Sequence, residues 1–174
     1  MPAHAEDAPG AGPVSAKDTE TEMHPAIVRS PQGDVFYWNV DGPVGINGTN
    51  KYDDVLFVQW CFYKMGKWDR LDADLRAICR TTPVNGECTG REDDPLIAII
   101  KALQRSQKGL KVDGQVTPPT KDVQYVHHGK SHLFLILYLN AVLRVLHPAQ
   151  YPRIDLMPEF IWKIKAKATV PFIN

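Results

Sequence analysis

The sequence lacks a net charge and lacks a long apolar run. Its 174 residues carry 20 Lys and Arg against 20 Asp and Glu, so no overall positive field would attract nucleic acid or an anionic membrane. No segment reaches the roughly 20 apolar residues that a membrane-spanning helix requires. The nearest, 133–146, is shorter and contains Asn140 and Arg144. We therefore expect no nucleic-acid partner and no transmembrane segment.

The N-terminus lacks the basic stretch and apolar run of a secretory signal. We expect a protein made in the cytoplasm, which could be delivered to a periplasm by a route that needs no such signal. Residues 1–26 nearly lack large apolar side chains and are rich in Ala, Pro, Gly, Glu and Thr. Such a segment cannot bury enough surface to offset the entropy of ordering it, so we predict a disordered tail.

Motifs for catalysis are lacking as well. There is no HExxH sequence, and the glycine-punctuated VGINGTN has neither the lysine nor the preceding buried strand of a phosphate-binding loop. His128 and His132 are four residues apart and are weak candidates for a zinc site, but no motif supplies a third ligand or a general base. We expect no enzyme activity and no cofactor.

Cysteine is scarce, with three residues in the chain. Cys61 falls in an apolar helical pattern and is expected to be a small buried hydrophobic residue. Cys79 and Cys88 bracket the turn-rich RTTPVNGE. They could close a short disulfide or remain two free thiols, and the sequence leaves both alternatives open.

Three apolar-periodic segments predict helices, at 53–65, 95–108 and 131–147. Asp53 and Asp54 can cap the first helix, Asp-Asp-Pro precedes the second, and Ser131 can cap the third. The first helix is apolar on two sides, so the N-terminal arm, the C-terminal tail or a partner must cover its second face. A weaker helical patch, 71–78, lies in the connection between the first and second helices.

Two further segments are predicted to be arms outside the helical core. Residues 27–43 contain DVFYWNV bounded by turn residues, which predicts a short strand or an extended arm. Its Phe36, Tyr37 and Trp38 need cover, so we expect them to pack on the body of the protein, with a ligand shelf as the alternative. Residues 148–174 end in an alternating Lys-rich pattern, which predicts an amphipathic strand or arm, or a short helix.

The phrase GLKVDGQVTPP places a sharp turn after the second helix. Asp113 tolerates a left-handed backbone, Gly114 takes a positive φ at little cost, and the two prolines that follow cannot continue a helix. We expect most residues of the glycine-rich loop, the Asp-Gly loop and the helix faces to be structural. Gln59 and Gln104 are expected to tie loops to helices.

The order of these phrases resembles the peptidoglycan-binding-like domain, a three-helix module of bacterial cell-wall enzymes. The matching residues are Gly45, Gly48, Asn50, Asp54, Val55, Val58, Gln59, Ile100, Gln104, Gly109, Leu110, Val112, Asp113, Gly114, Val116, Pro118, Gly129, Leu139 and Asn140. The resemblance covers about 44–147. It implies a mainly α fold: a three-helix core with an N-terminal aromatic arm or strand and a C-terminal amphipathic arm. The connection between the first two helices is longer than is usual in that family.

The resemblance implies a non-catalytic protein that binds bacterial peptidoglycan and thereby targets or anchors a partner enzyme or a secreted toxin. The expected site is a groove between the helices and the Asp-Gly loop, near Trp60, Tyr63, Trp68 and Asp113. The alternative is a protein–protein adaptor that reuses the fold in a secretion or toxin system, type VI secretion among them. Such an adaptor would form a homo- or hetero-oligomer.

Overall fold

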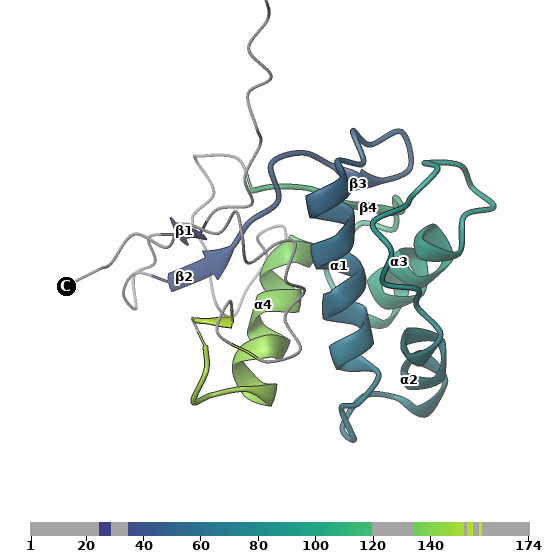
Figure 1. The fold of residues 1–174 in the computed structure, drawn as a ribbon. Coiled ribbons are helices and arrows are strands. Elements are labelled where there is room, and N and C mark those ends of the chain that lie inside the picture. Colours follow the sequence, from purple (N-terminus) through teal and green to yellow (C-terminus); the bar gives the residue numbers. More distant parts are fainter. Residues whose placement is uncertain (1–24, 29–34, 120–133, 152, 155–156, 158–174) are drawn as a thin grey trace, which may run out of the picture.

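The protein is mainly helical, with two short pairs of strands (Figure 1). The computed structural model describes residues 25–28, 35–119, 134–151, 153–154 and 157. Outside the described residues lie 1–24 of the tail predicted at 1–26, His128, His132 and the alternating segment 158–174. Pro25 and Ala26, which the prediction also assigned to the tail, are part of a strand. The elements are β1 (Pro25–Val28), β2 (Val35–Trp38), β3 (Val44–Gly45), α1 (Tyr52–Met65), α2 (Ala73–Arg80), α3 (Pro95–Ser106), β4 (Gln115–Val116) and α4 (Leu135–Leu146).

Helix α1 lies at the centre, with α4 on one side and α2 and α3 on the other (Figure 1). It is buried along nearly its whole length, and the rings of Phe57 and Trp60 stack with centroids 6.3 Å apart. The apolar second face predicted for this helix is thus covered within the protein. Each large apolar side chain that is fully buried stabilises the fold by about 2 kcal/mol. Helix α1 buries more such side chains than any other element, so it is the main source of the apolar core.

Helix α2 is a fourth helix that the three-helix expectation does not include. The patch predicted at 71–78 forms a full element because Asp72 accepts hydrogen bonds from the first-turn amides of Asp74 and Leu75. Its Cys79 is buried in the core. The elaborated connection between α1 and α3 is therefore part of the folded body.

Helices α3 and α4 agree with the prediction at one end each. Asp94 caps α3 by accepting from the amide of Leu96, and Pro95 occupies the first turn as expected. Helix α3 ends at Ser106, two residues early. Helix α4 ends at Leu146, next to the predicted stop, but begins at Leu135 rather than 131, with no side-chain cap at Phe134. Ser131 lies outside the described residues.

The two strand pairs bring distant segments together. Strands β1 and β2 form an antiparallel pair in which Pro25 lies opposite Trp38, and β3 and β4 pair with Val44 opposite Val116. Trp38 is fully buried and Tyr37 nearly so. The prediction that the aromatic arm packs on the body is confirmed for these two side chains.

The segment after α4 begins to wrap the body, as Ile154 and Met157 join the core and Tyr151 packs edge-on against Phe36. None of the helices in the described part of the chain has the length and apolar character needed to cross a membrane.

Candidate functional site

The opening loop after β3 is held by very close backbone approaches. Gly45 has a φ of +116°, and a Cβ there would lie 2.1 Å from the carbonyl oxygen of Gly114. Asn50 clamps the same residue, since its Oδ1 accepts from the Gly45 amide at 2.7 Å and its Nδ2 donates to the Gly45 carbonyl at 3.0 Å. At Gly48 a Cβ would lie 2.4 Å from the Pro43 carbonyl oxygen. These residues are therefore structural, as their chemistry predicts.

Gln104 of α3 holds the Asp-Gly loop through what we call the second clamp, formed with residues 113–115. Its Oε1 accepts from the amides of Asp113 at 3.1 Å and Gly114 at 2.9 Å. Its Nε2 donates to Oδ1 of Asp113 and to the carbonyl of Gln115. The predicted role of Gln104 in tying a loop to a helix is confirmed. Asp113 is thereby occupied in holding its own loop.

Gln59 of α1 builds the first clamp in the same pattern with residues 85–87. Its Oε1 accepts from the amides of Asn85 at 3.0 Å and Gly86 at 2.8 Å. Its Nε2 donates to Oδ1 of Asn85 and to the carbonyl of Glu87, each at 3.0 Å. The role predicted for Gln59 is also confirmed. The sequence signal was present, since Val-Asn-Gly at 84–86 repeats Val-Asp-Gly at 112–114.

Asp54 does not cap α1, contrary to the prediction. The N-cap position is Lys51, which makes no side-chain cap bond. Asp54 instead accepts from the amides of Asp41 and Gly42, each at 3.0 Å. Burial raises its pKa from 3.8 to about 6, against the two amide bonds that lower it; the charge of Asp41 adds to the rise and that of Lys51 opposes it.

Asn140 of α4 anchors the aromatic arm. Its Oδ1 accepts from the Trp38 amide at 2.7 Å, and its Nδ2 donates to the Trp38 carbonyl at 2.8 Å. The hydroxyl of Tyr151 lies 3.0 Å from both Oδ1 of Asn140 and the carbonyl oxygen of Phe36, so it can donate to either. Asn140 is thus the structural residue that fixes β2 against the last helix.

The four residues predicted to bind a ligand do not form one surface. Trp60 is 1% exposed, beneath the ammonium of Lys64, so its ring cannot face a ligand. Tyr63 is 36% exposed and Trp68 half-buried, both near the C-terminal end of α1. Asp113 comes just before β4, which pairs with β3 near the other end of the helix (Figure 1). The predicted groove through all four residues is therefore wrong.

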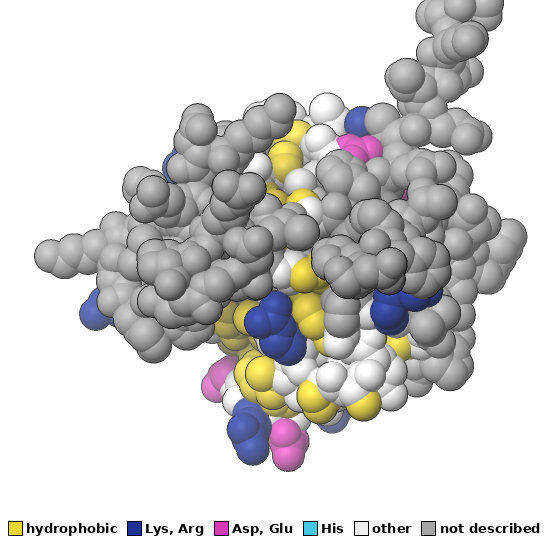
Figure 2. All heavy atoms as spheres, turned by 90° about the vertical axis from the view of Figure 1, so that its left-hand side faces the viewer, with side chains coloured by type: hydrophobic (Ala, Val, Ile, Leu, Met, Phe, Trp, Pro, Cys, Tyr) yellow, Lys and Arg dark blue, Asp and Glu magenta, His cyan; other side chains and the backbone are white. Residues whose placement is uncertain are grey.

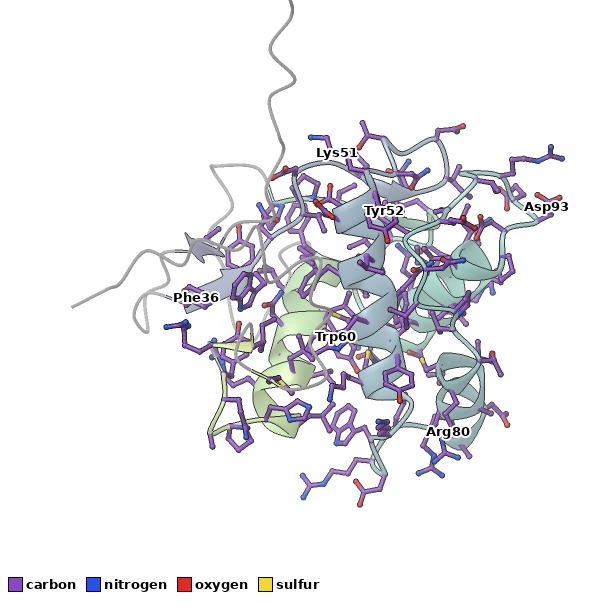
Figure 3. The ribbon with its side chains drawn as sticks, viewed as in Figure 1. Phe36, Lys51, Tyr52, Trp60, Arg80 and Asp93 are labelled. Carbon is purple, nitrogen blue, oxygen red and sulfur yellow. The ribbon has the colours of Figure 1, made fainter. Side chains whose placement is uncertain are left out.

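The structure instead brings Tyr63 together with Tyr52 of α1 and with the exposed side chains of the loop at 85–87. Tyr52, Gln59 and Tyr63 follow one another at helical spacing, which places them on one face. Tyr52 is 43% exposed, and a Cβ on Gly86 would lie 2.3 Å from its Cε2. The first clamp therefore lies over the middle of this face, between the two tyrosines along the helix. We call Tyr52, Tyr63, Asn85 and Glu87 the α1 face; Figure 3 labels Tyr52 at its upper end.

The cysteines provide no nucleophile. All three are free, so the structure has the two-thiol alternative and no Cys79–Cys88 disulfide. Burial raises the pKa of Cys61 well above its usual value, that of Cys79 to about 11, and that of Cys88 as well. A thiol of this kind stays protonated and unreactive at neutral pH. Among the residues that the structure describes, no group of three His, Cys, Asp or Glu could hold a metal ion.

In comparisons with known proteins, no protein-family model, no curated protein and no solved structure matches this chain.

Proposed function

We propose that the chain is a non-catalytic binding module that recognises bacterial peptidoglycan and so targets or anchors a partner enzyme or a secreted toxin. The proposal keeps the peptidoglycan-binding-like core that the sequence resembles. It is supported by the order of the loop motifs in the sequence and by the contacts of their polar residues. Gln59, Gln104 and Asn140 each hold a loop or strand against a helix, and Asn50 holds Gly45 within the opening loop.

The α1 face is the observation that carries the proposal. It offers two partly exposed tyrosine rings on one helix and, between them, the amide of Asn85 and the carboxylate of Glu87. Tyrosine rings present a flat apolar surface with a polar end, which suits the C–H faces and hydroxyls of sugars. Amide and carboxylate groups beside them can pair with sugar hydroxyls and peptide amides. A glycan strand with peptide branches matches this mixture.

Lys67 gives one end of the α1 face a positive charge. Its ammonium lies 4.4 Å from the centroid of the Tyr63 ring, so it covers one side of that ring and leaves the phenol edge exposed. A carboxylate of a wall peptide could pair with this ammonium while the sugar rests on the tyrosines. Trp68 is half-buried near the same end of α1 and packs against the core.

Cosedimentation with purified sacculi tests the proposal. The wild-type chain should pellet with sacculi above an unrelated protein of similar size. Tyr63→Ala and Tyr52→Ala should each weaken binding by about tenfold, because truncating one anchoring aromatic residue in an interface commonly has that effect. Val145→Ala on α4 is the matched control and should leave binding unchanged, since Val145 is exposed on another helix. Equal pelleting of wild type and the unrelated protein would remove the proposal.

A protein–protein adaptor is the second candidate, and exposed apolar side chains favour it. Val145 of α4 is 55% exposed and Ile78 of α2 is 39% exposed. Figure 2 views the molecule from the side of α4 and the aromatic arm, where hydrophobic side chains reach the surface below the grey atoms. If Val145 lies in a self-association surface, light scattering after size exclusion should show a dimer that Val145→Asp converts to a monomer. A wild-type monomer would count against self-association.

A further inference from the structure

Four Asx-Gly dipeptides occur in this chain, at 41–42, 47–48, 85–86 and 113–114. Such dipeptides are chemically labile because glycine places no side chain in the way of ring closure. The glycine amide nitrogen, after losing its proton to base, attacks the side-chain carbonyl carbon of the Asx residue. A nitrogen–carbon bond forms, the carbon–nitrogen bond of an Asn side chain breaks and ammonia leaves. From Asp the carboxyl must first be protonated, and water leaves. Water then opens the succinimide to aspartate or isoaspartate.

In three of the four dipeptides, one helix side chain accepts from both amides of the pair. Gln59 does this for 85–86, Gln104 for 113–114 and Asp54 for 41–42, with every donor–acceptor distance between 2.8 and 3.1 Å. The acceptors come from two helices and two residue types. What they share is the pair of amides that they engage, one of which is the nucleophile of the cyclisation.

The first clamp blocks the reaction at Asn85 in two ways. The Gly86 amide is buried and donates to Oε1 of Gln59 at 2.8 Å, so base reaches it only after the loop opens. Oδ1 of Asn85 accepts from Nε2 of Gln59 and from the amide of Glu87, each at 3.0 Å. These bonds fix the side-chain oxygen against Gln59 and against the amide of Glu87, two residues further on. Ring closure must break this arrangement before the nitrogen can reach the carbonyl carbon.

We infer that Gln59 protects the Asn85-Gly86 dipeptide from succinimide formation, and that Gln104 and Asp54 protect Asp113-Gly114 and Asp41-Gly42 in the same way. The side chains are positioning groups: each engages the nucleophilic glycine amide as a hydrogen-bond donor, so this bond must break before the amide can lose its proton and attack. Deamidation of Asn85 would place a carboxylate beside Glu87, whose Oε2 now accepts from Nδ2 of Asn85 at 3.3 Å. An effect of this deamidation on ligand binding at the α1 face rests on the proposed function. The protection of Asn85 by Gln59 does not rest on it.

Asn47-Gly48 supplies an internal reference. No helix side chain accepts from its amides: the Gly48 amide donates to the Gly45 carbonyl at 3.0 Å and the Asn47 amide to the Gly90 carbonyl at 3.3 Å. The Asn47 side chain is exposed and has no hydrogen bond within the part of the chain that the structure describes. Its rate of deamidation should therefore be independent of Gln59 and Gln104.

The test ages the full chain as wild type, Gln59→Met and Gln104→Met, in mildly alkaline buffer to follow Asn and in mildly acidic buffer to follow Asp, whose carboxyl must be protonated. Site-resolved peptide mass spectrometry and isoaspartate detection give the rates. Gln59→Met should raise deamidation at Asn85 by about tenfold or more while Asn47 keeps its wild-type rate, because only the local opening free energy of the first clamp has changed. Gln104→Met is the matched control, since it loses the same set of bonds elsewhere. It should leave Asn85 unchanged and raise isoaspartate at Asp113 by a smaller factor, because β3 still holds residues 113–115 in place.

Two results would overturn the inference. One is an unchanged rate at Asn85 in Gln59→Met. The other is a parallel rise at Asn47 and Asn85 in either variant, which would mean that the fold as a whole gives the protection; unfolding of Gln59→Met would have that same signature. Acceleration confined to the dipeptide whose clamp was removed supports the inference.

Discussion

The two glutamine clamps have the same hydrogen bonds but different surroundings. In each, one Gln accepts from the amides of an Asx and a Gly and donates back to the Asx side chain and to the next residue's carbonyl. The first clamp joins residues 26 apart and the second joins residues 9 apart. Helix α2 lies within the longer connection. One local geometry therefore serves a distant loop and a near one.

The difference lies in what else holds each loop. Residues 113–115 are also tied to β3, since the Ile46 amide donates to the Gly114 carbonyl and Gln115 pairs with Gly45. The loop at 85–87 is joined to α1 by its four hydrogen bonds with Gln59, and among the described residues it pairs with no strand. Loss of the glutamine side chain should therefore affect the two loops differently. The loop at 113–115 stays in place with unsatisfied amides, and the loop at 85–87 moves into water.

The largest effect should come from Gly45, which lies against the second loop. Gly45→Ala combines a φ of +116° with a Cβ 2.1 Å from the backbone oxygen of Gly114. We expect a loss of about 4 kcal/mol in the free energy of unfolding, measured by urea titration. Gly109→Ala is the matched control: its φ is +95° but its Cβ would meet nothing within 4 Å. It should cost about 1 kcal/mol from backbone strain alone. Equal costs would show that the close approach at Gly45 is dispensable.

Replacing each glutamine by methionine tests the comparison directly. Gln104→Met should lower the free energy of unfolding by about 3 kcal/mol, because the pinned loop keeps its amides buried without acceptors. Gln59→Met should cost about 2 kcal/mol, because its loop can open and hydrate those amides. Hydrogen exchange at Gly86 should then rise far more in Gln59→Met than exchange at Gly114 does in Gln104→Met. Matching stability losses and matching exchange would mean that the strand pairing adds nothing to the second loop.

The sequence predicts that Gln59 and Gln104 each hold a loop, but it identifies the loop only for Gln104. A Gln at the end of a helix, nine residues before an Asp-Gly turn, has one nearby loop to hold. Gln59 has no such neighbour in sequence; its partner loop follows a further helix, whose formation at Ala73–Arg80 was itself only weakly indicated. Local turn chemistry identifies Asn85-Gly86 as a turn. Its docking onto α1 is a tertiary event.

The predictions for Asp54 and Trp60 were wrong for the same physical reason: tertiary packing decides where these side chains lie. Asp54 has the residue type of a helix cap, but the amides of Asp41 and Gly42 compete for its carboxylate once the loop folds over α1. Trp60 reads as an exposed aromatic residue on a helix that is apolar on two sides, and α1 is covered on both. Which of its aromatic residues reach water depends on the packing of α2, α4 and the 85–87 loop. Tyr52 was missed because nothing local separates it from the buried members.

Asp54 holds a loop in a similar way to the two glutamines, but with a carboxylate, so its contribution to stability depends on pH. Its pKa is raised from 3.8 to about 6, mainly by burial, so the folded state binds its proton more tightly than the unfolded state does. The stability it contributes is therefore fully present below the unfolded value and is lost as pH rises through about 6. Asp94 has a lowered pKa, because three hydrogen bonds from Thr89 and Leu96 outweigh its burial, and it shifts stability in the opposite direction.

An Asp54→Asn variant isolates this term from that of Asp94. The free energy of unfolding of wild type minus that of the variant should grow by about 2 kcal/mol as pH falls from about 7 to about 4.5. Urea titrations of both proteins at each pH provide the measurement. A difference that shrinks on acidification would mean that the two amide bonds govern the pKa of Asp54 and that burial does not.

The smallest effects should come from exchanging the two Asx residues, and they should be unequal. Asp113→Asn keeps an Oδ1 that accepts from Gln104 and Gln115 and loses only the pair with Lys111, whose Nζ is 3.6 Å away on an 86% exposed side chain. It should cost less than about 0.5 kcal/mol. Asn85→Asp replaces a donor to Glu87 with a second carboxylate and should cost about 1 kcal/mol, shrinking at high salt. Thermal melts at low and high salt compare them, and a salt-independent cost at Asn85 would place the loss in the clamp geometry and not in charge.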